Sequence, residues 1–386
     1  MLALSARPYA QAAKRSGFCV SVIDGFLDQE TLAIAQHAQA VPFDEKGFEI
    51  NALKNALEAL NAEQFVGCIY ASGVEAQPEL LALIGQKMPV FGQAPAIIQQ
   101  VKNATSFFAT LDAFNIAHPL VFTQLPEQLP PNFLVKSAHG AGGQHIRYAE
   151  PTVTLDANEY LQALINGESV SVLFLVEKNA HVTTQVKAHV IGFNLQWTNP
   201  TQTQPFRFGG IASNHDLPEK IKSQLREIVQ TLAEAFELVG LNSLDVVIQD
   251  EKIFVLEINP RLSASVDLYA QDLFEKFNLD LIQLHIQSCL GAHFSETVKN
   301  QLAILPKNTG SKAMAIVYAE QDSALNDIAW PAWVNDKPIN HSITLKKSPV
   351  CSVISYETSA LLAKSAVEIQ VDLIQAQLES CSVLAQ

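Results

Sequence analysis

The clearest alternation of apolar and polar positions in the chain lies between residues 244 and 265. Two apolar runs rich in β-branched residues, LDVVIQ and KIFVLEIN, flank a polar tip at residues 250–252, and this pattern predicts a β-hairpin. With a three-residue loop centred on Glu251, Asp245 would lie directly opposite Glu257. Both side chains would then point to the same face of the hairpin.

Two carboxylates at that separation repel each other and raise one pKa unless a cation neutralises them. Asn259, two residues beyond Glu257, returns to the same face, and Arg261 follows. Carboxylate and carboxamide oxygens suit Mg²⁺, which usually brings substrate phosphates with it. The alternative is a surface hairpin whose acids face water, as most acidic side chains do. The position of both acids in the most apolar part of the chain favours the metal site.

A second candidate site is the glycine-rich stretch at residues 137–143, which a predicted strand ending in Lys136 leads into. Glycines let backbone N–H groups approach phosphate oxygens, and a lysine adds a point charge. The stretch is not a Walker A loop, and His145 stands where a dinucleotide fingerprint needs its third glycine. We interpret His139 and His145 as ordinary loop histidines rather than phosphate donors. The glycines that would approach phosphates are Gly140, Gly142 and Gly143.

The string E-I-N-P-R ending at Arg261, an aspartate twelve residues before its glutamate, and a K-x-x-x-G-x-G-G loop about 120 residues ahead together resemble the ATP-grasp superfamily. Members of that family activate a carboxylate with ATP. The resemblance implies binding of ATP and of one or two Mg²⁺ ions, the metal held by Asp245, Glu257 and Asn259. The nucleotide would be bound by Lys102, Lys136, the three loop glycines, the hinge residues Ala163, Leu164 and Ile165, and Glu168 at the ribose.

The resemblance also implies catalytic roles for Lys136 and Arg261, which would offset charge on the phosphates and on the tetrahedral intermediate. On the acceptor side it implies substrate contacts by Arg207, Gly209, Ser263 and Ser265. Alternatives stay open at three positions. Lys102 could be a solvated lysine at a helix start, Arg207 could belong to a plain turn, and family hinges usually carry an acid where Ala163 stands.

The order of predicted elements is that of an α/β protein with α+β lobes. Strands at residues 2–4 and 18–23 flank a helix at 9–15, which predicts a parallel pair, and further helices are expected at 29–39, 49–60 and 78–83. By resemblance, residues 1–100 form a Rossmann-like pre-ATP-grasp domain, 101–300 the nucleotide-binding lobes, and 301–386 an extension that completes the last lobe. Asp24, at the end of the second strand, is either structural or substrate-binding.

Composition excludes several other classes. A net charge of −14 and a pI of about 5.1 argue against a nucleic-acid surface. No apolar run approaches the roughly 18 residues that a membrane span needs, and the first residues lack the apolar core of a signal peptide. Five scattered cysteines without C-x-x-C spacing are typical of reduced structural thiols. We expect a cytoplasmic enzyme with small-molecule substrates; a homodimer is left open.

The phosphate-cradling stretches, the hinge, and the acid pair with its Asn and Arg together predict phosphoryl transfer, and the fingerprints of hydride enzymes and serine hydrolases are both missing. By resemblance, an acyl phosphate forms and an amine attacks it to give an amide and ADP. The strings S-A-R-P, D-G-F-L-D and S-P-V-C-S-V resemble ATP-grasp ligases of one-carbon cofactor synthesis, including those that join tyramine to glutamate. We therefore expect glutamate to be joined to an amine of a methanofuran-like or pterin cofactor. Alternatives are a nucleotide-binding regulator without turnover and an enzyme of carboxyphosphate or carbamoyl chemistry.

Overall fold

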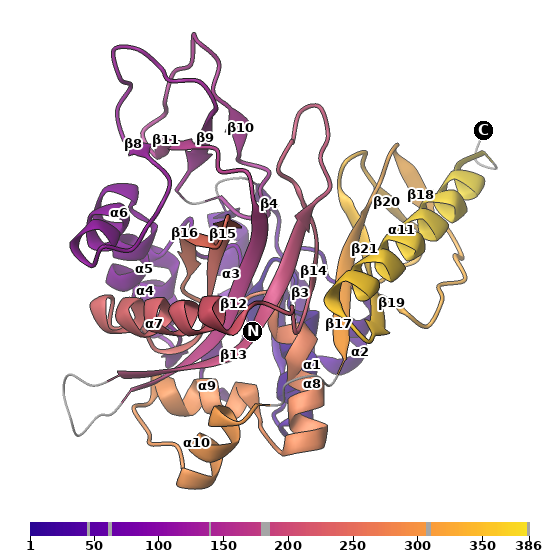
Figure 1. Ribbon diagram of the computed structural model, residues 1–386. Coiled ribbons are helices and arrows are strands. Elements are labelled where there is room, and N and C mark those ends of the chain that lie inside the picture. The colour runs from indigo at the N-terminus through magenta and orange to yellow at the C-terminus, as the bar shows by residue number, and fades with distance from the viewer. Residues whose placement is uncertain (45–46, 61–63, 139, 179–185, 306–309, 384–386) are drawn as a thin grey trace.

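The computed structural model describes residues 1–44, 47–60, 64–138, 140–178, 186–305 and 310–383, with side chains described as far as residue 379 (Figure 1). The chain folds into a large antiparallel sheet, a small sheet beside it, and an N-terminal α/β region. Within the described ranges, no helix combines the length and the apolar character needed to cross a membrane.

The N-terminal region is built on short parallel strands. Strands β1 (Leu2–Ala3), β2 (Ser21–Asp24) and β3 (His37–Ala40) pair in parallel, and a bridge between Leu2 and Tyr70 carries the arrangement towards the parallel pair β6 (Cys68–Ile69) and β7 (Val90–Phe91). The predicted parallel pair of the first two strands is confirmed. The other elements of the region are α1 (Arg7–Arg15), α2 (Gln29–Ile34), β4 (Phe43–Asp44), β5 (Gly47–Phe48), α3 (Ile50–Ala59), α4 (Glu79–Gly85) and α5 (Pro95–Lys102).

The helix predicted at residues 29–39 is wrong in its second half. Helix α2 ends at Ile34, Ala35 takes an extended conformation, and the chain enters β3. The reason is tertiary, because the backbone N–H of Gln36 donates to Val20 O at 2.8 Å and β3 then pairs with the edge of β2. The available edge of β2 supplies hydrogen-bond partners for the backbone of residues 36–40. This strand pairing outweighs the helical propensity of the sequence there.

The small sheet has the order β10–β9–β11–β8 and carries the glycine-rich stretch. Its strands are β8 (Val121–Phe122), β9 (Phe133–Ser137), β10 (Arg147–Tyr148) and β11 (Glu159–Ala163), and α6 (Ala104–Ala113) precedes them. In Figure 1 this sheet stands above the large sheet at the upper left. Strand β9 is buried along most of its length, so Lys136 is carried into the interior rather than into solvent.

The large sheet has the order β16–β15–β12–β13–β14–β17–β21–β19. Its central strand β12 (Glu168–Lys178) is buried on both faces, with alternate residues in different cores. Val170, Val172, Phe174 and Val176 pack towards α6 and α7 (Glu219–Ala235), whereas Leu173 and Leu175 pack towards α1, α8 (Val266–Phe277) and α9 (Leu281–Cys289). The other strands of this core are β13 (Val186–Thr198), β14 (Phe208–Ala212), β15 (Gly240–Gln249) and β16 (Lys252–Asn259).

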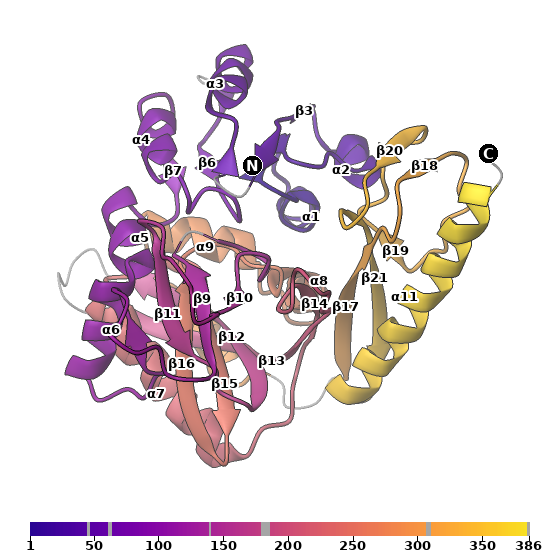
Figure 2. The same ribbon diagram turned by 90° about the horizontal axis from the view of Figure 1, so that it is seen from above.

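The last part of the chain continues the same sheet. Strand β17 (Ser311–Tyr318) pairs with β14, β21 (Pro349–Glu357) pairs with β17, and α11 (Ala360–Val383) packs against them through its own apolar core. Figure 2 shows this extension meeting the N-terminal region near α2. The remaining elements are α10 (Glu296–Ala303), β18 (Ser323–Leu325), β19 (Val334–Asn335) and β20 (Ser342–Thr344).

Candidate active site

The hairpin of β15 and β16 brings Asp245 opposite Glu257, as predicted, but with a different turn. The loop has two residues, Asp250 and Glu251, since Gln249 pairs directly with Lys252, and both loop residues have positive φ angles of 48° and 61°. Positive φ at both positions is typical of the type I′ turn that suits hairpin twist. The predicted three-residue loop is therefore wrong.

A β-bulge restores the predicted facing of the two acids. Val246 pairs with Val255 while Asp245 pairs with Glu257, so Leu256 is the extra residue. A tight turn alone would have moved the far end of β16 by one position and turned Glu257 to the other face. The bulge compensates for that shift, which is a feature often found next to active sites.

The acids lie in a partly buried polar cluster, which we call the acid centre: Asp245, Glu257, Asn259 and Lys102. The Lys102 Nζ lies 3.4 Å from Glu257 Oε2 and 3.3 Å from Asn259 Oδ1. Asn259 Nδ2 donates to Asp245 Oδ2 at 2.9 Å, and Gln196 Nε2 donates to Asp245 Oδ1 at 3.3 Å. Lys102 is only 6% exposed and ends α5, so the interpretation as a solvated lysine is wrong.

The surrounding charges shift the pKa values of the two carboxyl groups in opposite directions. Burial and the neighbouring Glu257 raise the pKa of Asp245. Burial would also raise the pKa of Glu257, but Lys102, Lys136 and His145 together lower it below its ordinary value. Glu257 is thus the ionised, well-compensated partner, whereas the charge on Asp245 lacks full compensation. A carboxyl group in this condition would gain from an additional cation.

Lys136 reaches the same centre from the small sheet. It is 4% exposed and lies on β9 opposite Tyr160 of β11, whose hydroxyl contacts it. Burial lowers the pKa of Lys136, but Tyr160, Glu257 and Asp245 more than offset this and raise it above its ordinary value. Lys136 therefore stays charged next to the acids, as its predicted role requires.

The glycine-rich stretch packs on the segment before β14. Phe208 N donates to Gly142 O at 2.9 Å. Gly143 has a φ of +71°, and a Cβ there would collide with the carbonyl oxygen of Phe206, so only glycine fits. A Cβ at Gly140 would overlap the ring of His145.

His145 lies closer to the chemistry than its interpretation as an ordinary loop histidine suggests. Burial, with Lys136 and Lys102 nearby, lowers its pKa to about 4, so it is neutral. Its buried Nδ1 has no hydrogen-bond partner among the described residues. Such an atom is unusual in a folded protein and fits a ligand that would supply a partner. His139 lies outside the described residues.

The predicted adenine hinge connects β11 and β12. The N–H of Ala163 donates to Leu120 O and the N–H of Leu164 donates to Asn132 O, both at 2.8 Å, so any main-chain contact with adenine would come from the carbonyl oxygens and from Ile165. Glu168 Oε2 lies 3.0 Å from Nε2 of the buried His215. Sequence reasoning missed Gln162, which is 2% exposed and whose Nε2 has no partner among the described residues.

On the predicted acceptor side, Arg207 is a buried residue rather than part of a plain turn. Its guanidinium lies 3.8 Å above the ring of Tyr318, and it donates to O and Oδ1 of Asn199 at 3.1 and 2.9 Å. Gly209, beside it, sits in β14 against β13. Ser263 and Ser265, both buried at the start of α8, share a hydrogen bond of 2.7 Å between their hydroxyls.

Arg261 is held by a residue that the sequence did not single out. Its Nε forms an ion pair with Glu75 Oε1 of the N-terminal region, and its NH2 donates to Asn259 Oδ1 at 3.2 Å. Asp24, by contrast, is fully buried and accepts N–H bonds from Ala6, Phe26 and Leu27. These bonds favour the structural interpretation of Asp24.

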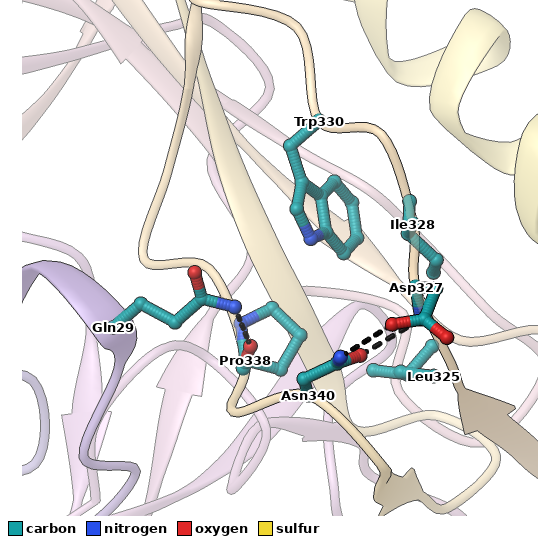
Figure 3. A pocket seen from close by; sticks show the side chains of 7 residues that line it. All are labelled: Gln29, Leu325, Asp327, Ile328, Trp330, Pro338 and Asn340. Atoms are coloured by element: carbon teal, nitrogen blue, oxygen red, sulfur yellow. Dashed lines mark hydrogen bonds between the residues drawn. The ribbon is translucent and has the colours of Figure 1, made fainter.

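A pocket of about 530 Å³ lies elsewhere, between α2 and the C-terminal extension (Figure 3). Figure 3 shows the indole of Trp330 on one side and Asp327, hydrogen-bonded to Asn340, on another. None of the site residues predicted from the sequence lines this pocket. The residues that line it are Gln29, Leu325, Asp327, Ile328, Trp330, Pro338 and Asn340.

Comparison with known proteins agrees with this geometry. A model of the ATP-grasp domain matches residues 103–265. The carbamoyl phosphate synthase large chain of Pseudomonas aeruginosa is 25% identical over 237 residues, which are 58% of this chain and 22% of that protein. The tyramine–L-glutamate ligase of Methanocaldococcus jannaschii is 28% identical over 142 residues, which are 36% of this chain and 39% of the ligase. The matches thus span well under half of either relative.

Among solved structures, the L-amino acid ligase from Bacillus licheniformis superposes with a TM-score of 0.68 and covers 96% of both chains. Its sequence identity is 14%, so this likeness concerns the fold alone. The matched domain covers the glycine-rich stretch, the hinge and the acid hairpin together. Residues 103–265 therefore form a domain of the ATP-grasp family.

Proposed function

We propose that the protein is an ATP-dependent carboxylate–amine ligase that forms an amide through an acyl phosphate and releases ADP. The observation that carries the proposal is the acid centre itself. Two opposed, partly buried carboxyl groups and a carboxamide lie beside two buried lysines, and the strand that carries one of these lysines leads into the glycine-rich stretch. This combination suits phosphoryl transfer, in which catalysis is mostly positioning and charge compensation.

The residues present fit the ligands that this chemistry needs. Asp245, Glu257 and Asn259 would hold one or two Mg²⁺ ions, and a bound Mg²⁺ would neutralise charge on the ATP phosphates. Lys102 and Lys136 provide fixed positive charge beside these acids. Gly140, Gly142, Gly143 and the unpartnered Nδ1 of His145 would face the phosphates, while Ala163, Leu164, Ile165 and Glu168 would hold the adenosine.

The chain's own residues would also stabilise the later steps. The guanidinium of Arg261 lies one hydrogen bond from Asn259, so it is placed to compensate charge on the acyl phosphate and on the tetrahedral intermediate that follows amine attack. Arg207, Gly209, Ser263 and Ser265 would line the acceptor side. Burial of the surrounding groups strengthens each of these electrostatic contacts.

For the substrates we propose glutamate and an amine of a methanofuran-like or pterin one-carbon cofactor. Support comes from the partial likeness to tyramine–L-glutamate ligase and from the strings at both ends of the chain. The second candidate is carboxyphosphate chemistry, favoured by the likeness to carbamoyl phosphate synthase. A regulator that binds nucleotide without turnover is the third candidate, and the intact pair of acids disfavours it. We place the enzyme in the cytoplasm.

The test is a screen for nucleotide products. The protein is incubated with ATP, Mg²⁺, glutamate and tyramine, then with other amino acids and amines, and the nucleotides are resolved by chromatography. We expect ADP that depends on both substrates. AMP and pyrophosphate would refute the acyl phosphate route, ADP that depends on bicarbonate would favour the second candidate, and binding without ADP under any condition would favour the regulator.

A further inference from the structure

Glu75 is a buried carboxylate of the N-terminal region that lies between β6 and α4 and faces the acid centre. It is 4% exposed. Its Oε1 pairs with Arg261 Nε, and its Oε2 accepts the N–H of Gly73 at 3.0 Å. Both oxygens are therefore occupied by fixed donors, one from its own turn and one from the segment that follows β16.

The guanidinium of Arg261 is held on its remaining sides as well. Its NH1 donates to Leu262 O at 3.0 Å and its NH2 donates to Asn259 Oδ1 at 3.2 Å. Asn259 Oδ1 also accepts from Lys102, which contacts Glu257. A continuous set of hydrogen bonds thus runs from Glu75 through Arg261 to the predicted metal ligands.

A guanidinium is planar, with five donors in a fixed fork. A carboxylate at Nε fixes the direction in which the NH1 and NH2 edges point, so the rest of the fork cannot rotate freely. We propose that Glu75 is a positioning residue for the ligase reaction, which holds the Arg261 fork beside the acid centre and thereby couples the N-terminal region to the chemistry. The inference rests on the proposed function, because it assigns Arg261 a role in turnover.

Charge compensation supports the assignment. Burial alone would raise the pKa of Glu75, but Arg261 and Lys102 lower it below its ordinary value, so Glu75 is ionised. Burial would lower the pKa of Arg261, and Glu75 offsets this. Removing the carboxylate would leave a buried guanidinium without its main counter-charge, free to turn towards the nearby acids Asp245 and Glu257.

The first experiment requires no substrate. Protein labelled with ¹⁵N-arginine is observed by NMR, and the Arg261 Nε–Hε signal is identified by its loss in Arg261→Lys. In Glu75→Gln and in the milder Glu75→Asp we expect this signal to shift and broaden. Asp24→Asn, which removes an equally buried carboxylate from the same region, should leave it in place. An unchanged signal in both Glu75 variants would overturn the proposal.

The second experiment separates positioning from a purely structural role. In Glu75→Gln we expect kcat for ADP release to fall about 10- to 100-fold, as for other residues that orient a functional side chain, while KM for ATP changes less than about threefold. In Arg261→Lys, adding Glu75→Gln should cost little more, because the two residues act together. Multiplicative losses in the double variant would contradict the inference.

The two experiments also distinguish failure of the proposed function from failure of the positioning role of Glu75. If the wild-type protein forms no ADP with any substrate, the proposed function fails, and the NMR signal still decides whether Glu75 orders Arg261. If ADP forms and the signal is insensitive to Glu75, the function stands and the positioning role falls.

Discussion

Two charged clusters in the described part of the chain differ in how completely their charges are matched. One is the acid centre. The other, which we call the Arg7 junction, consists of Arg7, Asp267, Asp336 and Lys312. Arg7 Nε lies 2.6 Å from Asp336 Oδ1, Arg7 NH2 lies 2.7 Å from Asp267 Oδ2, and Arg7 NH1 donates to Gln11 at 3.0 Å. Lys312 lies 3.7 Å from the other oxygen of Asp267.

In the Arg7 junction, the charged groups pair with one another. Arg7, Lys312 and neighbouring cations lower the pKa of Asp267 to about 2 despite its burial, so its charge is fully compensated. The cluster joins α1, α8 and the C-terminal extension. In the acid centre, by contrast, burial and Glu257 raise the pKa of Asp245, and His145 Nδ1 lacks a partner among the described residues. A matched cluster acts as a cross-link, whereas an incompletely matched one is suited to binding a ligand.

The largest expected effect is that of Glu257→Gln, which removes one acid from the incompletely matched cluster. ADP release should fall by at least about 100-fold, because the predicted metal site loses a carboxylate, while the melting temperature should stay within a few degrees of wild type. Glu251→Gln at the exposed hairpin tip, where Glu251 pairs with Lys220, is the matched control. Near wild-type turnover at saturating Mg²⁺ would remove Glu257 from the metal site.

Arg7→Met should lower the stability of the protein and leave nucleotide binding unchanged. It leaves Asp267 and Asp336 without their shared partner, and breaking a buried ion pair costs about 3–5 kcal/mol. Urea titration should show this loss in the free energy of unfolding, with unchanged nucleotide affinity in the folded protein. Arg226→Met, which breaks an exposed pair with Glu219, should cost under about 1 kcal/mol. Equal costs for the two variants would show that the junction is no cross-link.

A buried histidine extends the comparison, because its hydrogen bonds are satisfied only when its ring is neutral. His285 is buried; its Nδ1 accepts the N–H of Leu241 at 2.9 Å, and its Nε2 lies 3.2 Å from Phe91 O. Burial lowers its pKa from 6.5 to about 4. As pH falls through 6.5 the unfolded chain takes up the proton first, so stability is lost until the folded protein also binds it near pH 4.

The expected loss between pH 6.5 and 4 is about 3 kcal/mol for this residue. It should appear as the difference between wild type and His285→Gln in the free energy of unfolding measured across this range. Other histidines titrate in both proteins, so the difference isolates His285. A constant difference across this range would mean that His285 does not titrate differently on folding.

The smallest effect is that of Lys136→Ala on binding. Loss of one buried positive charge should weaken binding of a non-hydrolysable ATP analogue about tenfold, which is about 1.4 kcal/mol, and should weaken binding of the amine less. Isothermal titration measures both affinities, with Lys187→Ala on the exposed side of β13 as the control. Unchanged nucleotide affinity would make Lys136 part of the scaffold.

Features that depend on neighbouring residues could be predicted from the sequence. Apolar alternation and a polar tip determine a hairpin, and side chains that alternate across its faces bring Asp245, Glu257 and Asn259 to one side. A strand that leads into glycines likewise carries Lys136 towards them. The loop length was predicted incorrectly, yet the facing of the acids was correct, because the bulge at Leu256 offset the shorter turn.

Contacts between distant segments were decided only by the tertiary structure. Nothing near Glu75 in the sequence indicates that it pairs with Arg261, 186 positions away, and the chain after Gln36 forms β3 only because the edge of β2 is available. The same holds for the position of Lys102 between Glu257 and Asn259 and for the unpartnered atoms of His145 and Gln162. Local patterns determine which face a side chain takes, but whether its charge or hydrogen bonds are matched depends on what the rest of the chain packs against it.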